Sequence, residues 1–506
     1  MQAQPDAAPR PAEPPRVMIL ITVSMCVTLY ALTVTIVNVV LPQLQGALSA
    51  TPEQVSWVVT LNVIATAVAT PMTGWLVARF GERRLILWSV FFFAVCSLLC
   101  ATAESLVPLL AYRIGQGVFG APLVPLGQAI IIATYPPERR AWAQGMFGMS
   151  VVFGPAIAPA LGGYLAEEYN WRWVFLLIVP LCVAAFVLAL VYIRDNIRGE
   201  RVRLDWTGFL AFSIAITCAQ FIIDRGERED WFDSLQILTL AGILIASVWV
   251  FLAHTATAKN PFINPALFRD RNFAIGLVLV LVYGMLNFTP TVLMPPMLQN
   301  LMGYPDSMIG VLLAARGAGM IIGFFMAGRM GRFDPRVGMI IGLAMIGASG
   351  WNMALFNLDV GPWAVAWNGV LQGIGTGLMW VPLSVVAFAT LPARMLPEAS
   401  SLFHLLRNFG SSFFISVSVF VVVRTAKVRY AELSEHVTPY SEGVRLPAVG
   451  GMWSFDTVPG LARFGAEVNR QAMMVGYANS FALYAALSFV TLPLLLFVRI
   501  RRRPVG

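Results

Sequence analysis

The sequence is short of charged residues. Only 12% of its 506 residues are Asp, Glu, Lys or Arg, whereas a soluble domain carries roughly 25%. Hydrophobic residues make up 58%. This deficit excludes a chain that faces water over most of its surface and indicates a polytopic membrane protein. We expect helices, because the apolar stretches run for about 20 residues or more and lack the ten-residue alternation of barrel strands.

Lysine is nearly absent. Its two copies, Lys259 and Lys427, each follow alanine, so the Gly-Lys-Ser/Thr of a P-loop cannot form and the chain by itself is not an ATP-driven pump. The histidines show no His-Glu-x-x-His spacing, no Cys/His cluster suggests a metal site, and no Gly-x-Ser-x-Gly elbow is present. We therefore expect no enzyme, cofactor or metal site. Gradient-driven transport, a channel and a receptor-like role are left.

Cysteine is scarce too. All five cysteines fall inside apolar runs and form no Cys-x-x-Cys, so we interpret them as small hydrophobic residues. Residues 1–16 are rich in Pro and Ala, which predicts a disordered tail. The apolar run that follows is too long for the core of a signal peptide.

Long apolar runs fill most of the remaining sequence. We expect each to cross the bilayer, and an even number of spans places both termini on the same side. The fourteen runs cover residues 17–41, 56–77, 85–103, 106–134, 141–165, 173–193, 206–223, 235–254, 273–298, 308–328, 337–358, 362–391, 400–423 and 474–498.

Basic residues predict the orientation. Of the 34 Lys and Arg residues, 22 fall in the tails and loops on the side of the two termini, which the positive-inside rule makes cytoplasmic. The net charge of +8 then reflects topology and suits an anionic inner leaflet, so no nucleic-acid partner is expected. The long outer loop 425–472 is either an ordered cap over the outer mouth or a docking surface for an extracytoplasmic partner.

Few ionisable groups lie inside the predicted spans: Arg113, Arg316, His404 and Arg407, with no Asp or Glu well inside. A charge at the bilayer centre costs on the order of 2.5–3.5 kcal/mol, which makes these residues functional candidates. Each arginine either caps helix carbonyls or belongs to a positive cavity for anionic or amphipathic substrates. His404 is either a proton carrier or a hydrogen-bonding cavity residue. Asp224, at the outer end of the seventh span, is the best remaining carboxylate.

Two segments of the chain echo each other. "QGVFGAPLVPLG" (116–127) in the fourth span is similar to "QGIGTGLMWVPLS" (372–384) in the twelfth. Their positions correspond if two extra spans are inserted in the middle of the chain. Two related halves are typical of secondary transporters.

Longer motifs follow a known pattern. "GWLVARFGERR" (74–84) contains Gly74, Arg79, Gly81 and Arg83, and "YRIGQG" (112–117) contains Arg113 and Gln116. The fifth span spaces Gly145, Gly154, Pro159, Gly162 and Gly163 so that they leave a groove and a pliable helix. In these motifs the chain resembles the 14-span drug:proton antiporters of the major facilitator superfamily. The resemblance implies that Arg113 handles protons and that the arginines of 74–84 anchor the cytoplasmic face.

The first and last spans depart from that family at two positions. In "LTVTIVNVVLP" (32–42), Thr35 and Asn38 match the family's first-span motif, but Thr33 stands where an acid is usual. In "GYANSF" (476–481), Asn479 stands where Asp or Glu is usual. Both sites that the resemblance assigns to proton-carrying acids hold neutral hydrogen-bonding residues.

These observations predict an all-α polytopic membrane protein with a major facilitator fold of 14 transmembrane helices. Two six-helix halves surround a central cavity, and two accessory helices lie between them. The expected units are a disordered cytoplasmic tail (1–16), the first half (17–194), helices 7 and 8 with their flanking loops (195–258), the second half with its loop 425–472 (259–498) and a basic cytoplasmic tail (499–506).

The predicted function is secondary active export of amphipathic or hydrophobic compounds by alternating access. The resemblance implies a proton gradient as the driving force and a bacterial inner membrane with both termini cytoplasmic. It also implies a periplasmic adaptor (membrane fusion protein) and an outer-membrane channel as partners, beside the small-molecule substrate and the lipid bilayer. A weakly coupled or uncoupled exporter of anionic lipids or fatty acids stays open, as does a non-transporting scaffold or sensor.

The residues assigned to transport form two predicted polar cores. Asn38, Arg113 and Gln116 belong to the first half, and Arg316, His404 and Arg407 belong to the second. Thr33, Thr35 and Asn479 complete the predicted cavity, and Asp224 and His404 are the candidate proton carriers.

Overall fold

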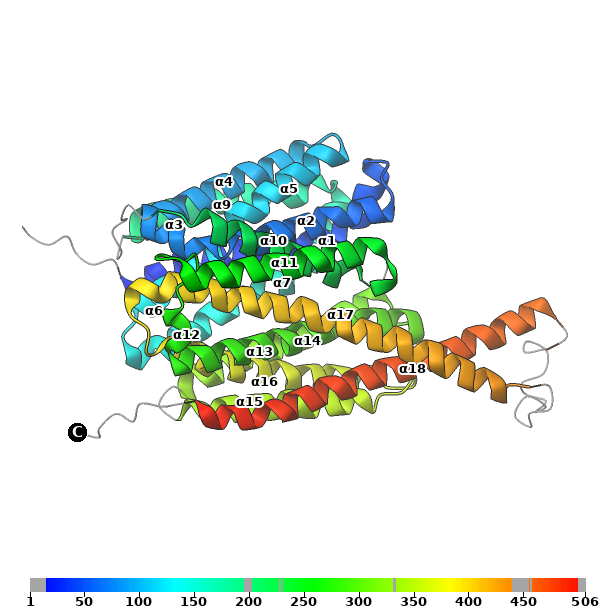
Figure 1. Cartoon of the computed structure of the whole chain (residues 1–506). Coiled ribbons are helices and arrows are strands. Elements are labelled where there is room, and N and C mark those ends of the chain that lie inside the picture. The colour runs from blue at the N-terminus through cyan, green and yellow to red at the C-terminus, as the bar shows by residue number, and fades with distance from the viewer. Residues whose placement is uncertain are drawn as a thin grey trace, which may run out of the picture.

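The computed structural model describes residues 15–194, 203–226, 229, 231–330, 334–438, 455 and 457–498. Over these ranges the chain is helical and has no strand. Long helices pack side by side in one bundle (Figure 1). In these ranges, thirteen helices are long and apolar enough to cross a membrane, or up to fourteen if one bent pair forms a single span. The predicted all-α fold with about fourteen spans is confirmed.

Nine helices form the first part of the chain, and proline divides two of the predicted spans. The second span bends by 56° between α2 and α3 at Pro71, and the fourth is interrupted between α5 and α6 at Pro122. The helices are α1 (Arg16–Ala47), α2 (Pro52–Ala69), α3 (Met72–Phe80), α4 (Glu82–Thr102), α5 (Leu106–Gly120), α6 (Leu123–Thr134), α7 (Pro137–Glu168), α8 (Arg172–Leu176) and α9 (Ile178–Tyr192).

The middle of the chain forms α10 (Trp206–Arg225), η1 (Trp231–Asp233), α11 (Leu235–Thr257) and α12 (Ala266–Arg269). The last part forms α13 (Arg271–Pro296), the π-helical turn η2 (Met297–Leu301), α14 (Asp306–Arg329), α15 (Pro335–Ala354), α16 (Pro362–Phe388), η4 (Ala393–Met395), α17 (Leu396–His436), α18 (Val458–Thr491) and η6 (Leu492–Phe497).

Buried apolar side chains gather into two cores. One core contains residues from 19 to 193 only. The other contains residues from 263 to 498, together with Ala129 and Ile132 of α6. Most of the apolar packing therefore stays within the first nine helices or within α12 to η6, and the two groups touch through α3, α6 and α7. We call these groups the first half and the second half.

The bundle has two different ends (Figure 1). The start of α1 and the end of η6 lie at one end. The exposed arginines Arg79, Arg84, Arg271 and Arg394 flank helix ends there, and we call it the basic side. At the other end α17 and α18 continue past their neighbours and project from the bundle. We call the projecting parts of α17 and α18 the hairpin, and that end of the bundle the hairpin side.

The hairpin corrects one expectation. Residues 425–472 were expected to form a loop, but α17 continues to His436 and α18 begins at Val458. Residues 411–438 contain no Gly or Pro, so nothing in the sequence ends the helix where its polarity rises. Residues 439–454 and 456 lie outside the described ranges. The described part of this segment projects outward and does not form a cap over the mouth of the bundle.

Helices α10 and α11 lie beside the two halves. On the side of the first half, Thr60 of α2 donates a hydrogen bond to Asp224 of α10 at 2.9 Å. On the side of the second half, Gln220 of α10 donates to Ser412 of α17 at 3.0 Å. Helix α11 fully buries only Ile237, and its half-buried Phe251 packs against Phe212 of α10 with the ring centres 5.1 Å apart. Most of its other apolar side chains are exposed. Helix α10 therefore bridges the halves, and α11 covers it.

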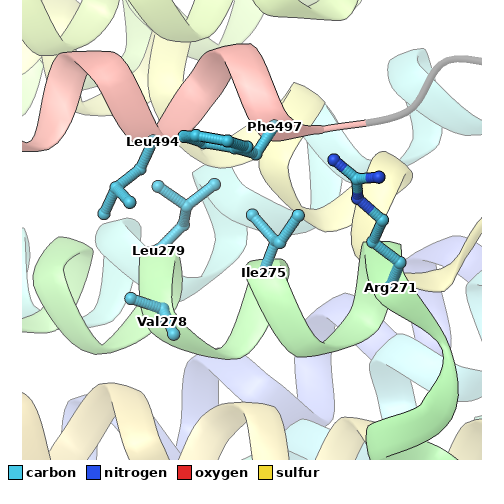
Figure 2. A pocket seen from close by; sticks show the side chains of 6 residues that line it. All are labelled: Arg271, Ile275, Val278, Leu279, Leu494 and Phe497. Carbon is cyan, nitrogen blue, oxygen red and sulfur yellow. The ribbon is translucent and has the colours of Figure 1, made fainter.

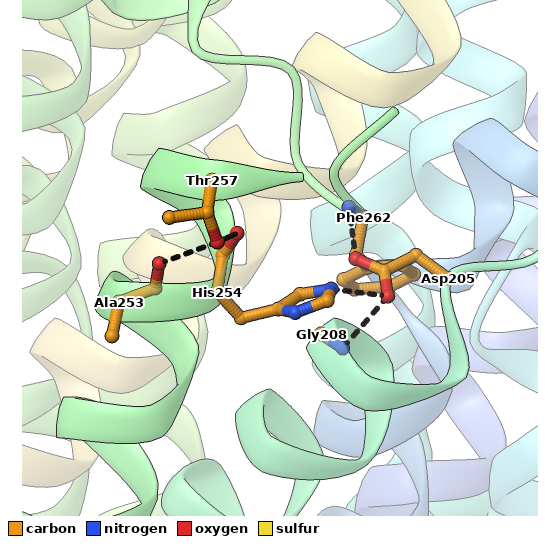
Figure 3. Close-up of polar contacts among 6 residues, drawn as sticks. All are labelled: Asp205, Gly208, Ala253, His254, Thr257 and Phe262. Carbon is orange, nitrogen blue, oxygen red and sulfur yellow. Dashed lines mark hydrogen bonds and ion pairs between the residues drawn. The ribbon is translucent and has the colours of Figure 1, made fainter. Parts of the chain in front are cut away.

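Asp205 joins the basic ends of the two accessory helices (Figure 3). Its carboxylate accepts hydrogen bonds from the N–H groups of Gly208 and Phe262, both at 3.0 Å, and lies 2.8 Å from Nε2 of His254. Burial raises the pKa of Asp205, but the three hydrogen bonds outweigh it, and the net effect is a lowered pKa. This Asp205 clasp ties α10 and α11 to the segment that leads into the second half.

Candidate functional site

The first half contains a buried arginine without an acidic partner. Arg113 of α5 is fully buried. Its Nε donates to the carbonyl oxygen of Val58 on α2 at 3.0 Å, and its Nη1 donates to the side-chain oxygen of Gln116. Gln116 in turn donates to Ser97 of α4 at 2.7 Å. A guanidinium has five N–H groups to satisfy, and here a carbonyl oxygen of α2 and an amide oxygen of α5 each accept one, while Nη2 is buried with no hydrogen-bond partner in the described part of the chain. The predicted pairing of Arg113 with Gln116 is present in the structure.

The second half repeats this chemistry with different helices. Arg316 of α14 donates through Nε to the side-chain oxygen of Gln372 on α16, and through Nη2 to Oδ1 of Asn287 on α13 at 2.8 Å. Gln372 also donates to the Tyr484 hydroxyl of α18 at 3.0 Å. Gln116 and Gln372 open the two echoing segments of the sequence. Each therefore accepts a hydrogen bond from an arginine of its own half, fully buried Arg113 in the first and half-buried Arg316 in the second.

Arg407 and Tyr30 lie between these two polar clusters. The Arg407 guanidinium of α17 lies 5.5 Å from the ring centre of Trp380 and contacts Oδ1 of Asn408 at 3.2 Å. Tyr30 of α1 pairs with Thr66, and the charges of both Arg113 and Arg407 act on it. The hydrogen bonds of Arg316, His404 and Arg407 go to different partners, although the charges of Arg316 and Arg407 both act on Tyr283. A shared polar core of these three residues in the second half stays a prediction.

His404 makes its hydrogen bond to the opposite half. Its Nε2 lies 2.8 Å from the side-chain oxygen of Gln128 on α6, and the Ser400 hydroxyl donates to that same oxygen at 2.9 Å. The Gln128 amide also points toward Gln144 of α7 at 3.4 Å. All four side chains are buried. We call Gln128, Gln144, Ser400 and His404 the latch, because it joins α6 and α7 of the first half to α17 of the second.

Glycines allow the helices of the two halves to approach closely near the latch. A Cβ atom at Gly145 of α7 would lie 2.9 Å from the carbonyl oxygen of Phe324 on α14. One at Gly74 of α3 would lie 2.7 Å from Cβ of Glu398 on α17. All these positions lie toward the basic side of their helices. The two halves are therefore in direct contact at the basic side.

The remaining motif glycines have other neighbours. A Cβ at Gly154 would lie 2.7 Å from the backbone nitrogen of Leu32 on α1, and one at Gly162 would lie 2.9 Å from the Ile36 side chain. A Cβ at Gly163 would meet no atom within 4 Å. The structure does not describe the side chain of Pro159. Gly81 adopts φ 86° at the α3–α4 turn, which favours glycine. Arg83 donates to the carbonyl oxygen of Leu190 at 2.8 Å.

The predicted cavity residues of α1 face different surroundings. Thr33 is buried and donates to the carbonyl oxygen of Leu29 at 2.7 Å, one turn earlier on the same helix. Thr35 does the same with Ala31 at 3.0 Å. Asn38 is exposed and takes no part in the hydrogen bonds of Arg113. A threonine hydroxyl can satisfy itself on its own helix in this way, whereas an acid at Thr33 would need another partner.

Asn479 and Asp224 are both exposed. Asp224 lies at the hairpin end of α10, where it accepts the hydrogen bond from Thr60 and neighbours Arg225, whose guanidinium stacks 4.1 Å from the Trp57 ring centre. The two candidate proton carriers therefore differ in access. Asp224 is exposed at the hairpin side, and His404 is buried in the latch.

Several polar residues of the site were not identified from the sequence: Ser97, Gln128, Gln144, Asn287, Gln372 and Tyr484. Only Gln372 carries a signal in the sequence, because it occupies the place of Gln116 in the echo. Gln128 and His404 are 276 residues apart, and no local pattern connects them.

Buried cations held by neutral groups, glycine-lined crossings and two contacting halves define a helical membrane transporter built from two halves. The chain belongs to the major facilitator superfamily, whose profile matches residues 23–415. It is 30% identical to the multidrug export protein EmrB of Escherichia coli strain K12 over 96% of this chain and 95% of that protein. It is 29% identical to the fatty acid resistance protein FarB of Neisseria gonorrhoeae over 84% of each chain.

A solved structure agrees with the fold. The human organic anion transporter MFSD10 (TETRAN) superposes with a TM-score of 0.63 at 12% identity, over 96% of this chain and 100% of that one. At this identity the likeness concerns the fold alone.

Proposed function

We propose that this protein exports amphipathic or hydrophobic compounds across a bacterial inner membrane by alternating access. The observation that carries the proposal is the direct contact between the halves on the basic side, around the latch. Such a contact can be made in one state and broken in the other while each half keeps its own core. The similarity to EmrB over nearly the full chain supports multidrug compounds as the substrates.

The orientation of the protein belongs to the same proposal. Short loops rich in Arg mark the cytoplasmic side, so we place the basic side and both termini in the cytoplasm. The structure then represents the state in which the cytoplasmic mouth is closed. Export requires this state for release of the substrate on the hairpin side.

We propose that proton coupling acts through His404. The side-chain oxygen of Gln128 only accepts hydrogen bonds, so the histidine must carry its hydrogen on Nε2. The opposite nitrogen, Nδ1, is buried with no hydrogen-bond partner, which suits a neutral ring. A proton on Nδ1 would place an unpaired charge inside the latch, one helical turn from the Arg407 cation. Protonation thus favours opening of the basic side.

This direction agrees with exchange of a proton for a substrate. A proton taken up from the hairpin side opens the latch, leaves on the cytoplasmic side, and lets a substrate bind before the latch closes again. Asp224 is the alternative carrier, because it is an exposed carboxylate at the hairpin side. Neither role requires an acid at Thr33 or Asn479.

Proton flux in reconstituted vesicles tests the assignment. His404→Gln keeps an N–H donor near Gln128 but cannot titrate, so we expect substrate binding to persist and substrate-induced proton movement to fall at least about tenfold. His436→Gln, at the exposed end of α17, is the matched control and should leave the flux unchanged. Loss of flux in Asp224→Asn alone would move the carrier to Asp224. Full coupled export in the His404→Gln, Asp224→Asn double variant would exclude both.

A second candidate is export of anionic lipids or fatty acids with weak or no coupling. Its specific support is the set of intramembrane arginines, none of which has a carboxylate partner among the described residues, together with the similarity to FarB. The test is a matched panel of anionic and cationic amphiphiles. Anion preference that weakens in Arg407→Gln, without proton counterflow, would favour this candidate. Cation preference with strong counterflow would exclude it.

We propose that the hairpin docks a periplasmic adaptor that leads to an outer-membrane channel. A groove of about 660 Å³ runs between α17 and α18, with Lys427, Tyr430 and Asn469 among its lining residues. We expect Tyr430→Glu to abolish co-purification of an adaptor while the spans stay folded. Arg429→Glu, one residue away and outside the groove, is the control. Unchanged co-purification in Tyr430→Glu would count against the docking role.

A further inference from the structure

The lipid-facing surface of the second half carries a groove near its basic end (Figure 2). The groove has a volume of about 320 Å³, within the range of roughly 300–1,000 Å³ that is typical of ligand pockets. Its walls are apolar except at one end, where the guanidinium of Arg271 lies. The lining residues are Arg271, Ile275, Val278 and Leu279 of α13, and Leu494 and Phe497 of η6.

The groove follows the direction of a membrane lipid. Ile275, Val278 and Leu279 follow Arg271 on one face of α13, because they are four, seven and eight residues further along the helix. This stretch spans about 12 Å along the helix axis, and one leaflet contributes about 15 Å of hydrocarbon. With Arg271 at the first residue of α13, the groove extends from the membrane surface through most of one leaflet. A single acyl chain has this length and direction.

The positive charge at the mouth of the groove is available to a ligand. Arg271 is exposed and has no hydrogen-bond or ion-pair partner in the described part of the chain. Arg336 of α15 donates to the carbonyl oxygen of Val498, the residue after Phe497, so a second arginine flanks the same end of η6. The neighbouring carboxylate of Asp270 accepts the Phe273 N–H at 2.9 Å and caps α13.

We propose that this groove binds an anionic phospholipid of the adjoining leaflet. The lipid phosphate lies at Arg271, with Arg336 adding to the local potential, and one acyl chain lies between α13 and η6 against Ile275 and Leu494. A zwitterionic phospholipid fills the same apolar walls but gains less from the two cations. The site is outside the latch and both polar clusters, so it does not depend on the proposed transport reaction.

Lipid binding to the purified full-length protein tests this site. Native mass spectrometry is used to titrate phosphatidylglycerol and phosphatidylcholine of identical chains. We expect the wild type to prefer phosphatidylglycerol, and Arg271→Gln to lower that preference about fivefold, since one basic residue at a membrane surface contributes about that factor. Arg271→Lys should retain most of it. Ile275→Trp fills the groove and should weaken both lipids.

Arg269→Gln is the matched control, because Arg269 is exposed on α12 two residues before Arg271 and does not line the groove. An unchanged preference in this variant supports a defined site. Equal losses in Arg269→Gln and Arg271→Gln would show that diffuse surface charge attracts the lipid, and would overturn the proposal. Equal binding of the two lipids to the wild type would overturn it as well.

Discussion

Glycines lie at two different kinds of helix–helix contact in this molecule, and we call each such contact a seam. Within each half, glycines let helices of one core touch, as Gly154 does between α7 and α1, and Gly284 does between α13 and α17. Between the halves, Gly145 of α7 meets Phe324 of α14. In the alternating access that we propose, the first kind of contact persists in every state, and the second exists only while the basic side is closed. We therefore expect glycine to affect stability in one seam and conformation in the other.

The largest expected effect is within the second half. A Cβ at Gly284 would overlap the carbonyl oxygen of Arg407, and the reciprocal Gly410 approaches the carbonyl oxygen of Leu281 in the same way. Backbone atoms on both sides leave no flexible side chain to yield. We expect Gly284→Ala to lower the free energy of unfolding by about 3 kcal/mol or more, measured by thermal unfolding in detergent. Wild-type stability in this variant would show that α13 and α17 are not so closely packed.

Gly154→Ala tests the equivalent seam of the first half. A Cβ there would meet the Leu32 nitrogen at 2.7 Å and the Thr28 carbonyl oxygen at 2.8 Å. We expect a loss of about 2 kcal/mol in the same assay, smaller than at Gly284 because the overlap is smaller. Gly163→Ala is the control from the same motif, since its surroundings are open. Equal losses at Gly154 and Gly163 would mean that helix flexibility, and not close approach, explains the motif.

The seam between the halves should respond differently. Gly145→Ala adds a methyl group 2.9 Å from the Phe324 carbonyl oxygen, a contact that opening of the basic side removes. We expect little change in unfolding but a shift of about 5- to 30-fold toward the open state, which corresponds to 1–2 kcal/mol. Spin labels at the exposed positions Arg79 and Arg394, one on each half, would report it as a longer distance. An unchanged distance distribution would place Gly145 among the structural glycines.

The same comparison explains what the sequence could predict. The glycines of α7 repeat along one helix, so their motif is visible in the sequence. Gly284 of α13 and Gly410 of α17 are 126 residues apart in the sequence, and neither forms a pattern alone. The spans were predictable because hydropathy reports burial in lipid. The water-exposed continuation of α17 was missed because hydropathy does not identify a helix outside the bilayer. The absence of Gly and Pro was the signal that the helix continues.

The contacts of the polar clusters were also predictable only where both residues lie on one helix. Arg113 and Gln116 are three residues apart on one helix, so their pairing follows from spacing. Arg316 is held by Asn287 and Gln372 from two other helices, and His404 by Gln128 from the other half. These contacts depend on how the helices cross, which a single sequence does not specify. The sequence identifies these ionisable residues because they lie inside predicted spans, but it does not identify their hydrogen-bond partners on other helices.

The smallest expected effect lies outside both seams, in the Asp205 clasp. The pKa of Asp205 is lowered in the folded protein, so its charge contributes stability above the unfolded value of about 3.9. That contribution is lost as the pH falls through the lower, folded pKa. We expect Asp205→Asn to cost about 1 kcal/mol at pH 7, and the difference from the wild type to shrink below about pH 4. Unfolding curves across pH 3–7 check this, and a difference that grows in acid would contradict a lowered pKa. Because Asp205 contacts neither seam, the variant should leave the Arg79–Arg394 distance unchanged, which separates loss of stability from a shift between states.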